Sequence, residues 1–166
     1  NCLRCKQIHI KKEDKTDIAL IDAVLLKADF IGSMLPFKAE NLSTILLTRA
    51  EPASIGISPI GGFFKPTGHH DDNGVVVQCD PRASRQINVP ISPGLHSYVG
   101  IDSVKRIALR DSVKFQGPGV LAFDGDRSIK LTTNEVATAK VLRDGPFIVE
   151  AEKVMAIAAA NNQFQI

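Results

Sequence analysis

Three aspartates in this sequence are the first candidates for chemistry, because each stands in or beside an apolar run. Asp22 interrupts IALIDAVLL (18–26), and Asp124 and Asp126 flank a glycine in VLAFDGDRSIKL (120–131). A carboxylate in a mostly buried segment costs free energy unless it is paired, hydrogen-bonded or facing a cleft. Asp22 is therefore either a structural hydrogen-bonding group or a ligand contact, and the sequence leaves both roles open.

The Asp-Gly pair of the second segment has a simpler explanation. Asp-Gly between two strand-like runs is the strongest short-range signal for a β-hairpin, so Asp124 and Gly125 are predicted to form its turn. That turn requires nothing of Asp126. Its carboxylate is therefore left as a candidate acid or base.

Further polar residues stand in the Gly-rich stretch TRAEPASIGISPIGG (48–62), notably Glu51, Ser54 and Ser58. A serine such as Ser54 caps a turn more often than it binds a ligand. GISPIGGF (56–63) has the glycine spacing of a phosphate-binding P-loop, but Gly62 and Phe63 occupy the positions of its lysine and its Ser or Thr. The P-loop is therefore rejected, and the sequence has no G-x-S-x-G elbow for a hydrolase.

Two groups of residues suggest metal ligands, and neither has a convincing spacing. Adjacent residues point in different directions, so HHDD (His69 to Asp72) is interpreted as a solvated hairpin loop. A zinc set can also be drawn from Cys2, Cys5, His9 and Cys79. There is no second C-x-x-C, and the first lies near a terminus, so we expect reduced thiols and no metal site.

Many short segments rich in Val and Ile must position these residues. They are four to eight residues long, are bounded by Gly, Pro, Asp or Asn, and include QIHI, LSTILLT, GVVVQCD, RQINVPI, VKRIAL, DSVKF, VLAF, SIKL, EVATAKVL and PFIVEA. Such spacing predicts a mainly β, many-stranded sandwich-like domain. IALIDAVLL is ambiguous between a strand and a helix.

Helices are expected to be few. The clearest is VEAEKVMAIAAANNQ (149–163), in which Val149, Val154 and Ala158 can share a face and which should end near Asn161. A short helical turn is predicted within PASIGISPIGG, with Pro52 suited to its first position.

The 166 residues, with 44% hydrophobic residues and a net charge of +2, suit one domain with a substantial core. The dispersed charge argues against nucleic-acid and membrane partners, and no apolar stretch approaches the roughly 20 residues of a membrane helix. We therefore expect a cytoplasmic protein. The start at Asn1 suggests a piece of something longer.

Four stretches together resemble the C-terminal domain of the NAD kinase and diacylglycerol-kinase-like superfamily, in the branch of the acetoin-catabolism protein X. ALIDAVLL is similar to an Ala-Leu-Asn-Glu strand, and TRAEPASIGISPIGG to Thr-Pro-Thr-Gly-Ser-Thr-Ala-Tyr. VPISPGLHS resembles Pro-Ile-Cys-Pro-His-Ser-Leu, and VLAFDGDRSIKL the Asp-Gly-Gln or Asp-Gly-Glu hairpin. The resemblance covers residues 17 to 150. It implies a strand and charged connection at 1–16 and the β domain at 17–166.

The resemblance also implies roles for individual residues. Asp22, Glu51, Ser54, Ser58 and Asp124 would contact a dinucleotide, NAD or NADP. Asp126 would stand at the position that activates the acceptor hydroxyl in the lipid-kinase branch. Two substitutions depart from the NAD-kinase pattern, since Ile21 replaces its Asn and Glu51 stands near its first Thr.

The family's Gly-Gly-Asp-Gly-Thr loop, which engages ATP, is absent from this sequence. The resemblance therefore implies the second lobe of an ATP-NAD kinase-like protein, with ATP and Mg held by a missing N-terminal lobe of the same protein. Such a chain would be inactive alone and would form homo-oligomers. The alternative function is a non-catalytic ligand-binding or oligomerisation module on the same scaffold.

Overall fold

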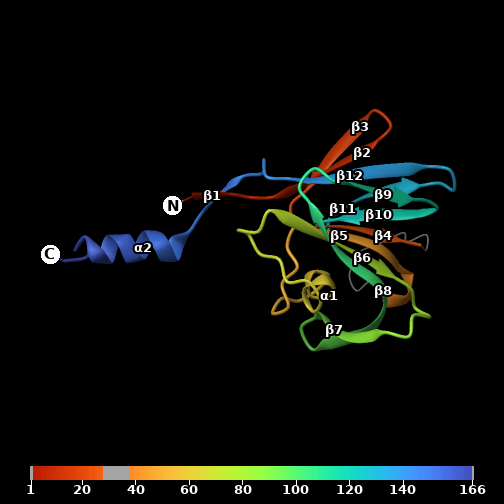
Figure 1. Ribbon diagram of the computed structural model, residues 1–166, viewed down its shortest axis with the longest axis horizontal. Coiled ribbons are helices and arrows are strands. Elements are labelled where there is room, and N and C mark those ends of the chain that lie inside the picture. The colour runs from red at the N-terminus through yellow and green to blue at the C-terminus, as the bar shows by residue number, and fades with distance from the viewer. Residues whose placement is uncertain (1, 28–37, 166) are drawn as a thin grey trace.

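A computed structural model describes residues 2–27 and 38–165, which form two facing antiparallel sheets and a projecting arm (Figure 1). The larger sheet has the order β11 (Arg127–Leu131), β10 (Gly119–Phe123), β4 (Asp22–Leu26), β5 (Leu42–Leu47), β6 (Asn73–Cys79), β8 (Leu95–Ala108) and β7 (Gln86–Ser92). The smaller sheet has the order β3 (Lys15–Ala19), β2 (Gln7–Lys12), β12 (Val136–Leu142) and β9 (Ser112–Gln116). The mainly β, sandwich-like prediction is confirmed.

One hydrophobic core lies between the two sheets, and a second covers the opposite face of the larger sheet. Ile8 and Phe115 of the smaller sheet meet Leu121 and Phe123 of the larger one in the first core. The second core packs β5, β6, β7 and β8 with Ile60 of the short helix α1 (Ser58–Gly62). Period-two alternation assigns neighbouring residues of the central strands to different cores.

The long apolar run of residues 18–26 is divided between the two sheets. Its start belongs to β3 and its end to β4, with Leu20 and Ile21 crossing between them. This resolves the ambiguity between strand and helix. The N-terminal strand region is also divided, because β1 (Cys2–Arg4) ends before β2, which contains QIHI, begins.

The predicted turn in PASIGISPIGG is present, but it begins later than expected. Pro52 lies in a bend in which the Ser54 amide donates to the Glu51 carbonyl, and Gly56 adopts φ +98°, which interrupts any helix. The helical turn α1 starts at Ser58 with Pro59 near its first position. A 3-10 turn, η1 (Ala39–Asn41), precedes β5.

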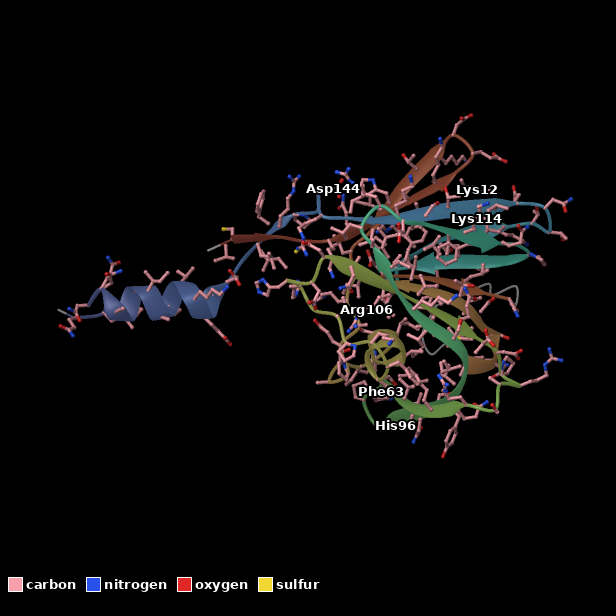
Figure 2. All side chains as sticks on the ribbon, in the orientation of Figure 1. Lys12, Phe63, His96, Arg106, Lys114 and Asp144 are labelled. Carbon is pink, nitrogen blue, oxygen red and sulfur yellow. The ribbon has the colours of Figure 1, made fainter. Side chains whose placement is uncertain are left out.

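The arm consists of β1 paired with β13 (Phe147–Val149), followed by α2 (Ala151–Ala160). The predicted C-terminal helix is confirmed and its C-cap is Asn161, but Val149 lies in the strand and cannot share the helical face. Figures 1 and 2 show α2 projecting away from the sandwich, and none of its residues is buried. In the described part of the chain, no helix has the length and apolar character needed to cross a bilayer.

Candidate functional site

One pocket of about 350 Å³ brings together residues from five separate parts of the chain. Its lining consists of Asp22, Val24 and Leu26 of β4, Leu42 of β5, Ile55, Gly56 and Ile57, Ile91, Ser92 and Pro93, and Ala122, Asp124 and Gly125. Each of the four stretches that carry the sequence resemblance contributes to this list. We call this cavity the Asp22 pocket.

Strand periodicity explains why these residues share the pocket. On β4, Ala23 and Leu25 pack between the sheets, so Asp22, Val24 and Leu26 face the opposite side. On the adjacent β10, Ala122 faces that same side. The pocket therefore has apolar walls and a carboxylate end.

The hairpin turn between β10 and β11 holds Asp124 at this end. Asp124 has φ +52° and Gly125 φ +75°, and the Asp126 amide faces the Phe123 carbonyl at 3.4 Å, as in a type I′ turn. The predicted hairpin is confirmed. The Asp124 carboxylate accepts hydrogen bonds from the Leu20 amide at 2.7 Å and the Ile21 amide at 2.8 Å.

Asp124 therefore has a structural role, because it holds the crossing between β3 and β4. Its carboxylate satisfies two backbone donors that lie outside the sheet ladders. Its own amide also donates to the Asp22 carbonyl at 3.2 Å. These bonds fix the position of Asp22 relative to the hairpin.

Asp22 lies partly buried at the start of β4. Burial and, to a smaller extent, the negative charge of Asp124 together raise the pKa of the Asp22 carboxyl to about 6, against the opposing effect of a hydrogen bond from the Asp124 backbone. A carboxyl whose pKa is raised in the folded state binds protons more tightly there than in the unfolded chain. It therefore reduces stability as the pH rises from about 4 through about 6.

The Asp22→Asn variant should consequently be more stable than the wild type by about 1 kcal/mol at pH 7.5. This is less than the full shift of the Asp22 pKa implies, because water in the open pocket screens the charge. The gain should almost disappear at pH 3, where the wild-type carboxyl is mostly protonated in both the folded and the unfolded state. Urea unfolding at the two pH values measures it. A pH-independent difference would contradict the assigned cause, and Asp102→Asn, on the exposed face of β8, is the matched control.

The other three predicted ligand contacts lie in the segment beside the pocket, and none of them lines it. Ser58 is buried, and its hydroxyl donates to the Arg49 carbonyl and accepts from the Glu51 amide, both at 2.9 Å. The Ser54 hydroxyl donates to the Glu51 carbonyl at 2.9 Å, which is the predicted turn-capping role. The Glu51 carboxylate lies 3.5 Å from Arg49.

Asp126 lies beyond the rim of the pocket. Its side chain is 71% exposed and is 3.4 Å from the guanidinium of Arg127. The role of an activating base therefore remains a prediction for this residue. Arg127 also pairs with Asp17, at 2.5 Å, which links the hairpin to β3.

The His69–Asp72 segment joins α1 to β6, so it is not the hairpin loop that the sequence suggested. Arg143 organises it by pairing with Asp72 at 2.7 Å and donating to the carbonyls of His69 and Asp71. Within residues 2–27 and 38–165, no group of three His, Cys, Asp or Glu side chains could hold a metal ion. The three cysteines are free thiols.

Comparison with known proteins gives a family for this arrangement. The family model for the acetoin catabolism protein X C-terminal domain matches residues 6–144. This chain belongs to that family. It is also similar to the acetoin catabolism protein X of Cupriavidus necator, with 29% identity over 136 residues.

The match with the Cupriavidus necator protein covers 80% of this chain and 38% of that relative. These matches establish membership of the acetoin catabolism protein X C-terminal domain family. The wider resemblance to NAD kinases stays a prediction. The family match ends at residue 144, so β13 and α2 lie outside it.

Sequence reasoning missed the apolar walls of this family member's pocket, among them Leu42, Ile55 and Ile91. No pattern distinguishes an apolar side chain that lines a pocket from one that fills a core. It also missed Lys6, which stands between Cys5 and the segment QIHI in the sequence and is buried in the structure.

Proposed function

We propose that this domain binds the nucleoside end of NAD in the Asp22 pocket, as the second lobe of an ATP-NAD kinase-like protein. The observation that supports this most directly is the convergence of four separate segments, each resembling a dinucleotide-site motif, on one pocket. A pocket of about 350 Å³ lies at the lower end of the range for small-molecule sites. It suits one nucleoside and leaves the rest of a dinucleotide outside.

The chemistry of the walls supports the same ligand. Val24, Ile57 and Ile91 offer apolar surface for a flat base, while Asp22 and Asp124 offer carboxylate oxygens near one another. Carboxylates accept hydrogen bonds from ribose hydroxyls and repel phosphate. A bound NAD would therefore place its nucleoside inside and its pyrophosphate outside, and NADP would bind more weakly through its additional phosphate.

Phosphoryl transfer depends mainly on positioning and on electrostatic stabilisation of the transferred group. Within the described residues, the Asp22 pocket has no basic side chain in its lining. ATP and Mg are accordingly assigned to another lobe of the protein. Asp126 is the proposed base for the acceptor hydroxyl in the assembled site, and the isolated domain is expected to have no kinase activity.

The arm is where we place that lobe. Pairing of Cys2 with Val149 puts the start of β1 beside the start of α2, so a lobe preceding residue 2 would emerge next to the helix. α2 exposes Val154, Met155 and Ile157, and such apolar residues on one element indicate a partner surface.

The same exposed arm favours the second candidate function, an oligomerisation module. A second copy of the chain could cover these side chains in place of a lobe. Sedimentation at several concentrations separates the two ideas. An association that is lost when residues 150–166 are removed supports the module, and a monomer at all concentrations argues against it.

Calorimetric titration with NAD tests the leading proposal. NAD at ten times its dissociation constant should stabilise the domain by about 1.4 kcal/mol, and NADP should require a higher concentration. Asp22→Ala should abolish NAD binding because it removes the main ribose acceptor, whereas Asp102→Ala, which removes an exposed carboxylate on β8, should leave binding unchanged. Absence of NAD binding at millimolar concentration, or equal binding by both variants, would contradict the proposal.

A further inference from the structure

A second cavity, of about 260 Å³, shares no lining residue with the Asp22 pocket. Leu20 and Ile21 line it, as do Lys6, Thr48, Arg49 and His69. Pro146 and Ile148, which flank the start of β13, contribute further apolar wall. We call it the Lys6 pocket.

Lys6 is unusual among the charged residues because its exposed fraction is only 3%. Its ammonium donates one hydrogen bond, to the Asn73 carbonyl at 2.8 Å. Across residues 2–27 and 38–165, no carboxylate lies within ion-pair distance of this ammonium. An ammonium has three N–H donors, so two remain for a ligand or for water.

The surrounding charges make this burial costly. Burial lowers the Lys6 pKa to about 8, and the positive charge of Arg143, followed by that of Arg49, contributes to the lowering, while Asp71 and Asp72 oppose it. A buried ammonium is stabilised by an anion that replaces its lost hydration. The molecule therefore contains a buried cation without an internal ion-pair partner, beside a cavity large enough for one.

Arg49 supplies a second cationic group at this cavity. Its Nη1 atom donates to His69 Nε2 at 2.7 Å and lies 3.5 Å from the Glu51 carboxylate. This bond requires His69 Nε2 to be unprotonated, and burial together with the charge of Arg49 lowers the His69 pKa accordingly. The Arg49 Nη2 atom makes no hydrogen bond to the described residues. It can therefore donate to a bound anion.

We propose that the Lys6 pocket binds a small aliphatic carboxylate, with its carboxylate group between Lys6 and Arg49 and its tail against Leu20, Ile21 and Ile148. A planar group with two acceptor oxygens matches an ammonium and a guanidinium that line the same cavity. The apolar walls favour an alkyl tail over a bare inorganic ion. A phosphate dianion is less well matched, because Arg49 already shares its charge with Glu51.

Calorimetry with sodium butyrate tests this site directly, with butyramide as the neutral isostere and sodium chloride at equal ionic strength. Butyrate should bind with a saturable isotherm in the millimolar range, and butyramide should bind at least tenfold more weakly. Inorganic phosphate should also bind more weakly than butyrate. Equal binding of butyrate and butyramide, or tighter binding of phosphate, would overturn the assignment.

Two variants locate the binding. Lys6→Met keeps the length and apolar stem of the side chain and should reduce butyrate affinity at least tenfold, while Arg49→Gln should reduce it several-fold in a chain that keeps the Lys6 ammonium. Lys15→Met removes the same charge from an exposed position on β3 and should change nothing. If Lys6→Met and Arg49→Gln both bind butyrate as the wild type does, the proposal is wrong.

The two pockets are distinguishable by the same variants. Lys6→Met should retain NAD binding in the Asp22 pocket, and Asp22→Ala should retain butyrate binding. Failure of NAD to bind therefore leaves the carboxylate proposal intact. Loss of butyrate binding in Asp22→Ala would overturn the assignment to the Lys6 pocket.

Discussion

Asp124→Ala should lower the free energy of unfolding by about 3 kcal/mol, measured by urea denaturation at pH 7. The carboxylate accepts hydrogen bonds from the backbone amides of Leu20 and Ile21, and the substitution leaves both donors without that partner. Hydrogen bonds to a charged group contribute about 1.5–3 kcal/mol each. The bond from Leu20 is exposed to solvent, so the expected total is nearer the lower end of the sum. Alanine also fits poorly at φ +52°.

Two variants on the same hairpin are the controls. Asp124→Asn keeps an acceptor oxygen and tolerates the left-handed backbone, so it should lose about half as much stability. Asp126→Ala removes a side chain that is 71% exposed and should change stability by less than about 0.5 kcal/mol. If the two alanine variants lost stability equally, Asp124 would not hold the crossing as described.

Phe123→Ala should have an even larger effect, about 4 kcal/mol, because its ring is 1% exposed in the core between the sheets. The substitution would leave a cavity beside Ala23, the residue with which Phe123 pairs on β4. It would also remove the aromatic ring whose centroid lies 5.0 Å from the Arg127 guanidinium. The backbone of β10 on either side of Phe123 carries Ala122 and Asp124 into the Asp22 pocket. We therefore expect NAD binding to weaken together with stability.

Phe147→Ala provides the matched control, since the same atoms are removed from a ring that is 66% exposed on β13. It should change stability by no more than about 0.5 kcal/mol. Differential scanning calorimetry of the two variants makes the comparison. Similar melting temperatures for both would show that the core between the sheets does not depend on Phe123.

The local sequence was most informative where one short-range rule acts alone. Asp124 and Gly125 form the predicted turn because a β-turn of that hand needs positive φ values at both central residues, which Asp-Gly accommodates. The helix ending at Asn161 follows from a run of good helix formers. Val149 was misassigned because pairing with β1, from the other end of the chain, keeps it extended.

The candidate site was predictable in part. Asp22 and Asp124 both line the pocket, and Ser54 caps a turn, as its residue type favours. The dinucleotide contacts that the resemblance implies for all three residues stay a prediction. The positions of Ser58 and Glu51 could not be deduced, because their partners lie on the backbone of a bend whose path depends on the packing of α1. Lys6 gave no signal in the sequence.

Alternation, turn residues and helix formers by themselves determined that this protein is a many-stranded β domain with a helix at its end, because each depends on neighbours within a few residues. Tertiary structure alone decided that Asp22 and Asp124 share one pocket and that the buried Lys6 lies beside Arg49. Those contacts join residues far apart in the chain through sheet register and packing. Apart from the Asp-Gly hairpin, no local pattern encodes which strands become neighbours, so the chemistry of both pockets emerges only from the folded sandwich.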